Sequence, residues 1–229
     1  MRSSRWHALG NSYVVVERPE LSASEARALA DDADGVVQVV ASGPDWAHVL
    51  IWNPDGSTAE MSGNGTRIAA RWLAEQTGAE LVRISVGERE ITARMLDDGQ
   101  VEQDLGPVAI GQRELVAGVE VTPVDVGNPH AVVVGSPDDL PRLGPLLETH
   151  PRFPNRTNVQ IVRIDRKGEV TARVWERGVG ETSASGTSAV AVAAATHGEG
   201  EVLVRFPGGE LRVRLAGGHA YLTGPAEHV

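Results

Sequence analysis

The chain repeats one pattern at a constant spacing, and this internal repeat constrains the fold more than any other feature. The segment 52–56 (WNPDG) lies ten residues ahead of Ser62, and the segment 175–179 (WERGV) lies ten residues ahead of Ser185. The offset between the two copies is 123 residues without a gap. Two like halves can bring matched groups to both sides of one small molecule, which indicates two-sided chemistry at a single carbon.

Further matches extend the repeat in both directions. Gly10-Asn11 precedes the apolar run 14–16, as Gly127-Asn128 precedes the apolar run 132–134, and Gln38 corresponds to Asn158. Each serine is followed by a helical pattern and then by a pattern typical of a β-hairpin, at 84–105 in the first half and 202–222 in the second.

Two helices after the serines define the expected cores. In residues 64–76 the apolar side chains fall on one face, the charged ones fall elsewhere, and Gly78 ends the helix. The face consists of Ile68, Ala69, Trp72 and Leu73, and the charged set is Arg67, Arg71 and Glu75. The segment 187–196 carries Ala and Val on every face, which predicts a buried helix inside a wrap of strands.

The remaining pattern completes the fold expectation. We expect short buried strands at 14–16, 49–52 and 132–134, and a surface helix at 21–32 that begins at Ser22 or Ser24. Hairpin turns are expected at 97–99 and 216–218, and an inter-domain connection at 103–116. The sequence therefore predicts an α+β protein of two mixed units, 1–107 and 108–229, each a set of strands around one central helix.

Composition excludes several classes of partner. A net charge of −10 argues against a nucleic-acid or anionic-membrane surface. No apolar run approaches the roughly 20 residues of a membrane span, and no signal peptide precedes the first strand pattern. We therefore expect a cytoplasmic protein without nucleic-acid or membrane partners. The chain has no cysteine, which rules out disulfides and thiolate metal sites.

Ser62 and Ser185 are the leading candidates for chemistry. Each precedes a glycine and the first turn of a helix, where free backbone N–H groups and the positive end of the helix dipole attract an anion. Gly63 and Gly186 allow a ligand to approach that backbone closely. The alternative is that both serines are ordinary N-caps, although their matched positions in two repeats favour a functional role.

Several other polar residues are further candidates for the site. Glu176-Arg177 lies in the loop that leads to Ser185, where the two side chains could also form a solvated pair, and His130 follows Asn128 near a strand start. The loop amides that could hold carboxylate or ammonium groups are Asn11, Asn53, Asn64 and Asn158. The His spacing fits no metal motif, and no glycine-rich phosphate loop is present.

Taken together, these motifs resemble the diaminopimelate epimerase family. They follow the family's order over nearly the whole chain: Gly10-Asn11, 53–57 (NPDGS), 60–65 (EMSGNG), 127–130 (GNPH), 153–158 (FPNRTN), 176–182 (ERGVGET), 185–187 (SGT) and 223–226 (TGPA). The resemblance implies two pseudo-symmetric domains with the active site in the cleft between them. It implies racemisation of an amino-acid α-carbon without pyridoxal phosphate, metal or other cofactor, here the interconversion of LL- and meso-diaminopimelate for lysine and peptidoglycan precursor synthesis. A homodimer is compatible with it.

The resemblance also implies a role for each site residue. In the family two cysteines flank the α-carbon, and Ser62 and Ser185 occupy those positions here. His130 and Glu176 would help to move protons at Ser62 and Ser185, respectively. The helix starts Gly63-Asn64 and Gly186-Thr187 would bind the α-carboxylate. The groups that would hold the rest of the substrate are Asn11, Asn53, Asn128, Asn158, Glu176 and Arg177, with Gln38 at a further lining position.

Replacing thiols by hydroxyls changes the expected energetics. A cysteine has a pKa of about 8.5, and a hydroxyl, like water, is a far weaker acid, so an anionic hydroxyl costs roughly 10 kcal/mol more than a thiolate. A helix N-terminus returns at most about 2 kcal/mol, which leaves general-base help from His130 or Glu176 as the route to activity. Two alternatives stay open: a non-catalytic or engineered Cys-to-Ser amino-acid-binding homologue, and another proton-transfer enzyme on this scaffold that uses His130 or Glu176 as its base.

Overall fold

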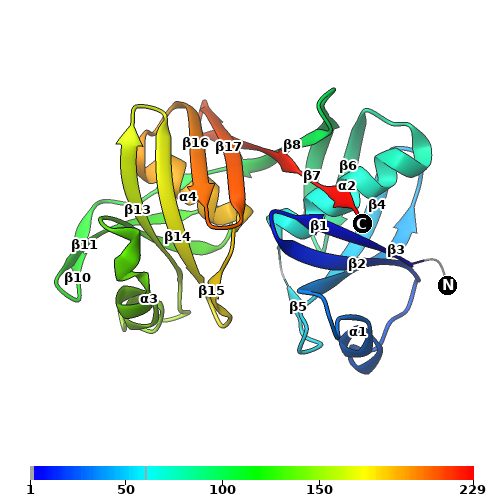
Figure 1. Ribbon diagram of the computed structural model, residues 1–229, viewed down its shortest axis with the longest axis horizontal. Coiled ribbons are helices and arrows are strands. Elements are labelled where there is room, and N and C mark those ends of the chain that lie inside the picture. The colour runs from blue at the N-terminus through cyan, green and yellow to red at the C-terminus, as the bar shows by residue number, and fades with distance from the viewer. Residues whose placement is uncertain (1–2, 60) are drawn as a thin grey trace. The chain divides into compact units, whose positions relative to one another are not determined.

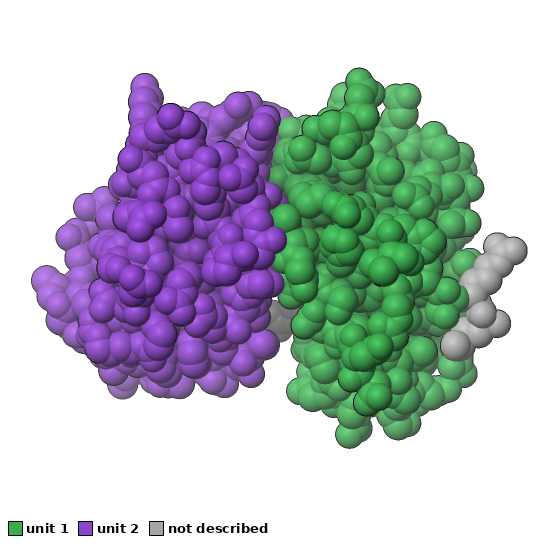
Figure 2. Space-filling model, viewed as in Figure 1, with its two compact units in different colours: residues 1–104, 223–229 green, residues 105–222 purple. Residues whose placement is uncertain are grey.

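The computed structural model describes residues 3–59 and 61–229, which form two compact units (Figure 2). Unit 1 comprises residues 1–104 and 223–229, and unit 2 comprises residues 105–222. The chain therefore passes between the units twice, once within strand β8 and once within β18. The bounds expected from the sequence for the two repeats, 1–107 and 108–229, stay a prediction.

Unit 1 is a continuous ladder of strands wrapped around helix α2 (Figure 1). Its helices are α1 (Ala23–Leu29) and α2 (Gly63–Thr77). Its strands are β1 (Ser3–Ala8), β2 (Asn11–Glu17), β3 (Gly35–Ser42), β4 (Trp46–Trp52), β5 (Thr58–Ala59), β6 (Leu81–Val86), β7 (Arg89–Met95), β8 (Gln100–Pro107) and β19 (Glu227–His228).

Unit 2 wraps its strands around helix α4 (Figure 1). Its helices are the 3₁₀ turn η1 (Pro137–Asp139), α3 (Leu140–Glu148) and α4 (Gly186–Thr196). Its strands are β9 (Ala109–Ile110), β10 (Glu114–Val116), β11 (Val119–Asp125), β12 (Pro129–Val134), β13 (Asn158–Arg166), β14 (Glu169–Glu176), β15 (Gly180–Thr182), β16 (Gly200–Phe206), β17 (Gly209–Ala216) and β18 (His219–Pro225).

The strand pairing repeats step for step, which confirms the duplicated fold. In unit 1, β1–β2 is antiparallel, β2–β3 parallel, β3–β4 antiparallel, β4–β6 parallel and β6–β7 antiparallel. In unit 2 the same sequence of directions runs through β11–β12, β12–β13, β13–β14, β14–β16 and β16–β17. The short strands β5 and β15 each pair antiparallel with the strand before them and lead into the central helix.

The two central helices form the cores, as the sequence predicts. Every residue of α4 from Gly186 through Ala194 is buried, because strands β11, β12, β13, β16 and β17 all contact it. Helix α2 packs Ile68, Trp72 and Leu73 into a core built from β1–β4 and β6–β8, and Gly78 ends it in the left-handed conformation. Arg67 differs from the prediction: the sequence placed it on the charged face of the helix, but it is fully buried.

Other details differ from the sequence pattern. Helix α1 is shorter than the expected 21–32, and Ser22 rather than Ser24 caps it, through a capping box with Glu25. The connection expected at 103–116 is largely strand, since β8, β9 and β10 occupy most of it. Within the described residues, none of the helices has the length and apolar character needed to cross a bilayer.

Candidate active site

Ser62 lies at the start of α2 and is hydrogen-bonded on two sides. Its extended backbone and its Oγ, which accepts from Gly65 N at 3.0 Å, make it the N-cap of the helix. The Tyr13 hydroxyl on β2 lies 3.1 Å from the same oxygen. Ser62 is half-buried and Tyr13 is 9% exposed, so the pair is largely withdrawn from solvent. Ser62 is therefore an N-cap, as the alternative interpretation had it, and its Oγ has the Tyr13 hydroxyl as a second partner.

A buried guanidinium organises the first turn of α2. Arg67 donates to the Asn64 Oδ1 at 2.8 Å and, through Nε, to the Pro225 carbonyl at 2.9 Å. Burial lowers the pKa of Arg67 to about 10, and the nearby Tyr13 opposes that shift. Arg67 thus stays cationic at neutral pH and adds a positive charge to the positive end of the helix dipole. Sequence reasoning missed this residue, because charged side chains are rarely buried.

The remaining predicted residues of unit 1 lie on strands β2 and β3 and in the turn after β4. Asn11 begins β2 and is half-buried. Asn53 follows β4 and donates through Nδ2 to the Ser57 Oγ at 2.9 Å. Gln38 is 1% exposed, accepts from the Trp52 indole at 2.9 Å and donates to the Arg18 carbonyl at 2.9 Å. These bonds give Gln38 a packing role, and its lining role stays a prediction. Glu60, part of a quoted motif, lies outside the described residues.

Ser185 lies at the start of α4 but has a different partner from Ser62. Its side chain makes no cap hydrogen bond to the helix and instead interacts with the Glu176 carboxylate at the end of β14, whose pKa it lowers. Thr182 also donates to Glu176, at 2.6 Å. Burial raises the pKa of Glu176, and the hydrogen bonds from Thr182 and Ser185 oppose that rise. The pair can therefore hold a proton that is shared between an acid and an alcohol.

His130 is buried in unit 2 with both ring nitrogens engaged. Gln160 Nε2 donates to His130 Nδ1 at 2.9 Å, so Nε2 carries the proton and donates to Asn128 Oδ1 at 2.9 Å. Burial lowers the pKa of His130 to about 3, and the positive charge of Arg177 lowers it further. The ring is therefore neutral at physiological pH. Gln160 also donates to Ser188 Oγ on α4, which ties His130 to the central helix.

Asn158 joins two of the loops that carry predicted residues. It lies beside His130 in the parallel pairing of β12 and β13. Its Nδ2 donates to the Pro129 carbonyl at 3.0 Å, and its Oδ1 accepts from Arg177 N at 3.0 Å. Asn158 therefore fixes the 128–130 loop relative to the turn that carries Glu176 and Arg177.

Glu148 supports the same turn from α3 and was not anticipated from the sequence. Its carboxylate is buried and accepts from Gly178 N and from Arg156, each at 2.6 Å, and from the Trp175 indole at 2.8 Å. Gly144 permits this packing, because a Cβ there would lie 2.8 Å from Trp175 Cγ. The helical spacing of the leucines at 140, 143 and 147 could have predicted α3, but Pro141 and Pro145 argue against a helix there.

The structure pairs the predicted residues of unit 2 as Ser185 with Glu176, His130 with Asn128, and Asn158 with the backbone of Arg177. In unit 1, Asn64 accepts from Arg67 within the first turns of α2, the helix that Ser62 caps. The backbone of Gly63-Asn64 and of Gly186-Thr187 begins α2 and α4, as expected. The partnership of His130 with Ser62 stays a prediction.

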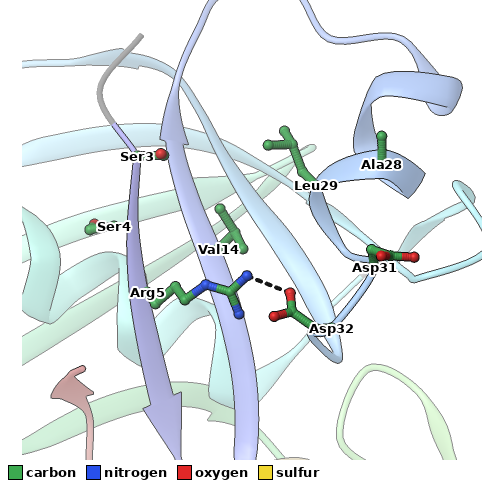
Figure 3. Close-up of a pocket in the computed structure, with 8 residues that line it drawn as sticks. All are labelled: Ser3, Ser4, Arg5, Val14, Ala28, Leu29, Asp31 and Asp32. Atoms are coloured by element: carbon green, nitrogen blue, oxygen red, sulfur yellow. Dashed lines mark hydrogen bonds and ion pairs between the residues drawn. The ribbon is translucent and has the colours of Figure 1, made fainter.

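A hollow of about 590 Å³ in unit 1 lies apart from these residues (Figure 3). It is lined by β1, β2 and the end of α1, and an ion pair between Arg5 and Asp32 spans part of it. None of the predicted site residues lines this hollow.

Comparison with known proteins identifies the family. The family model for diaminopimelate epimerase matches residues 4–110 and 122–229. Diaminopimelate epimerase of Desulforudis audaxviator is 37% identical over 274 aligned positions, which take in 100% of this chain and 97% of that protein. The Synechococcus elongatus enzyme is 35% identical over 271 positions, with 100% and 96% coverage. Both alignments exceed the 229 residues of this chain, so it lacks segments that these relatives have.

A solved structure agrees on the fold. A predicted epimerase from Pseudomonas aeruginosa superposes with a TM-score of 0.78 at 16% identity, covering 100% of this chain and 96% of that chain.

Proposed function

The chain is an isomerase of the diaminopimelate epimerase family, and from this premise we propose that it interconverts LL- and meso-diaminopimelate by two-base transfer of the α-proton. Ser62 and Ser185 act as the two groups that flank the α-carbon. The enzyme works without a cofactor, on a small amino-acid substrate, in the cytoplasm.

The observation that carries the proposal is the buried Glu176 carboxyl, which accepts a hydrogen bond from Thr182 at 2.6 Å and interacts with the Ser185 hydroxyl. An alcohol alone is too weak an acid or base at neutral pH, but a carboxyl group behind it can supply or accept the proton. Burial raises the pKa of Glu176, which makes this carboxyl a better proton acceptor than an exposed one. Ser185 and Glu176 therefore form an acid–alcohol pair suited to one face of a substrate.

Substrate binding follows from the helix starts and the loop amides. The free N–H groups of Gly63-Asn64 and Gly186-Thr187 bind the α-carboxylate, where the buried Arg67 and both helix dipoles favour negative charge. The remaining carboxylate and ammonium groups of the substrate contact the predicted polar set: Asn11, Gln38, Asn53, Asn128, Asn158, Glu176 and Arg177.

Serine in place of cysteine slows this enzyme relative to its relatives. The roughly 10 kcal/mol penalty for an alkoxide cannot be met by a helix dipole worth about 2 kcal/mol, so turnover depends on the groups behind each serine. We expect Ser62→Cys/Ser185→Cys to raise kcat by at least about a hundredfold, since each thiol can ionise by itself near neutral pH.

The second candidate function is amino-acid binding without turnover. The observation in its favour is His130, whose ring nitrogens both have partners within unit 2 and whose burial holds its pKa near 3. A base engaged in this way cannot accept a proton from Ser62 until one of its hydrogen bonds breaks.

Exchange of the α-proton distinguishes the two functions. LL-Diaminopimelate is incubated with the protein in deuterated water, and deuterium at the α-carbon is followed by NMR while binding is measured by calorimetry. Exchange that is abolished in both Ser62→Ala and Ser185→Ala supports the epimerase. Tight binding with no exchange, in both the serine protein and the double-cysteine variant, contradicts it.

A further inference from the structure

We propose that Tyr13 is the proton acceptor behind Ser62, so that the phenol does for Ser62 what the Glu176 carboxyl does for Ser185; this inference rests on the proposed function. The Tyr13 hydroxyl lies 3.1 Å from Ser62 Oγ, within hydrogen-bond distance. Tyr13 projects from β2, whose neighbour β3 packs against its ring at Gly35. The ring is held in the core around α2, which leaves the hydroxyl fixed at the helix start.

The surroundings of this pair favour a negative charge on oxygen. Arg67 is fully buried within the same helix turn and interacts electrostatically with Tyr13. A buried cation with carbonyl partners stabilises a nearby phenolate more than it would in water, because the local dielectric is low. Gly65 N donates to Ser62 Oγ, so negative charge that develops on the serine is stabilised as well.

The acidity of a phenol matches this task better than that of an alcohol. A tyrosine has a pKa of about 10, whereas an alcohol, like water, is a far weaker acid. Holding the negative charge on Tyr13 therefore removes most of the penalty that a serine alkoxide would carry. His130 offers no equivalent route in this structure, because Gln160 and Asn128 occupy its two nitrogens.

The proton transfer balances over both sides of the substrate. The Tyr13 phenolate takes the hydroxyl proton of Ser62 while Ser62 Oγ takes the α-proton, and the electron pair of the broken C–H bond stays on the α-carbon. On the other face Ser185 gives its hydroxyl proton to that carbon and regains one from the protonated Glu176. One proton has moved from Glu176 to Tyr13 in total, and the reverse reaction starts from that state.

The test is Tyr13→Phe in two backgrounds, the serine protein and Ser62→Cys/Ser185→Cys. In the serine protein we expect kcat for diaminopimelate epimerisation to fall by at least about a hundredfold, with KM changed by less than about threefold. In the cysteine background we expect a fall of less than about tenfold, because a thiolate at position 62 needs no phenol. Tyr221→Phe, the same change at the other tyrosine of the chain, should leave both proteins unaffected.

Each other outcome is decisive. Equal losses in the two backgrounds would show a structural role for Tyr13, and no loss in the serine protein would show that Ser62 loses its proton elsewhere; either result overturns the inference. An active cysteine variant beside an inactive serine protein also overturns it, while the family function stands. Absence of turnover in every variant, with folding verified by thermal unfolding, refutes the proposed function and the inference together.

Discussion

At the scale of single residues, the two serines differ although the sequence makes them equivalent. Ser62 bonds to a helix N–H group and a phenol, whereas Ser185 interacts with the Glu176 carboxylate. The sequence could place both hydroxyls at helix starts, because the repeat aligns them. It could not predict the burial of Arg67 or the bond to Tyr13, since both depend on which strands surround the helix.

His130 should make the stability of the fold depend on pH. Its pKa is about 3 in the folded protein and near 6.5 when unfolded, so between these values the unfolded chain binds the extra proton. The free energy of unfolding should fall as pH drops through this window, by up to about 1.4 kcal/mol per pH unit from this group. Urea unfolding of the protein and of His130→Gln at pH 4 to 7 measures the difference. Parallel pH curves would contradict the burial of a neutral ring.

Glu176 should carry the opposite pH dependence. Because burial raises its folded pKa, stability from this group is present below its unfolded value and is lost as pH rises towards the folded one. Glu176→Gln should therefore be at least as stable as the parent at pH 7, yet lose at least about a hundredfold in kcat. The exposed Glu199→Gln is the matched control. Wild-type turnover in Glu176→Gln would remove this carboxyl from the mechanism.

At the scale of secondary-structure elements, the central helices begin differently. Ser62 caps α2 through Gly65 N, whereas Ser185 makes no such bond to α4. Ser62→Ala should therefore lower the free energy of unfolding by about 1 kcal/mol, and Ser185→Ala by much less. Chemical denaturation of the two variants makes the comparison, each serving as the other's control. Equal losses would mean that the serines act alike as caps.

Glu148 holds helix α3 against the turn after β14, through its bonds to Gly178 N and the Trp175 indole. Glu148→Ala leaves the Gly178 N–H and the Trp175 indole without their acceptor, which should cost about 2 kcal/mol in stability. The loosened turn also carries Glu176 and Arg177, so we expect a higher KM for diaminopimelate. Unfolding and steady-state kinetics measure both effects, with Glu199→Ala as control. An unchanged KM would limit Glu148 to stability.

At the scale of the whole molecule, the internal repeat made the architecture predictable. The offset of 123 residues between the segments 52–62 and 175–185 implied two like units, and the matching order of parallel and antiparallel pairs in each unit agrees with it. Helix α3 escaped prediction because its prolines break the helical pattern. The assignment of residues 223–229 to unit 1 escaped as well, since it depends on contacts far apart in sequence, such as that of Arg67 with Pro225.

Isotope labelling tests the central claim, that two different groups act on opposite faces of one α-carbon. LL-Diaminopimelate is converted in deuterated water and the reaction is stopped early, before the product can react back. Two-base transfer predicts deuterium at the inverted carbon of the meso product, while the recovered LL substrate keeps its protium. Protium retained in the product, or substrate labelled as fast as product forms, would show that a single group moves the proton and would contradict the account.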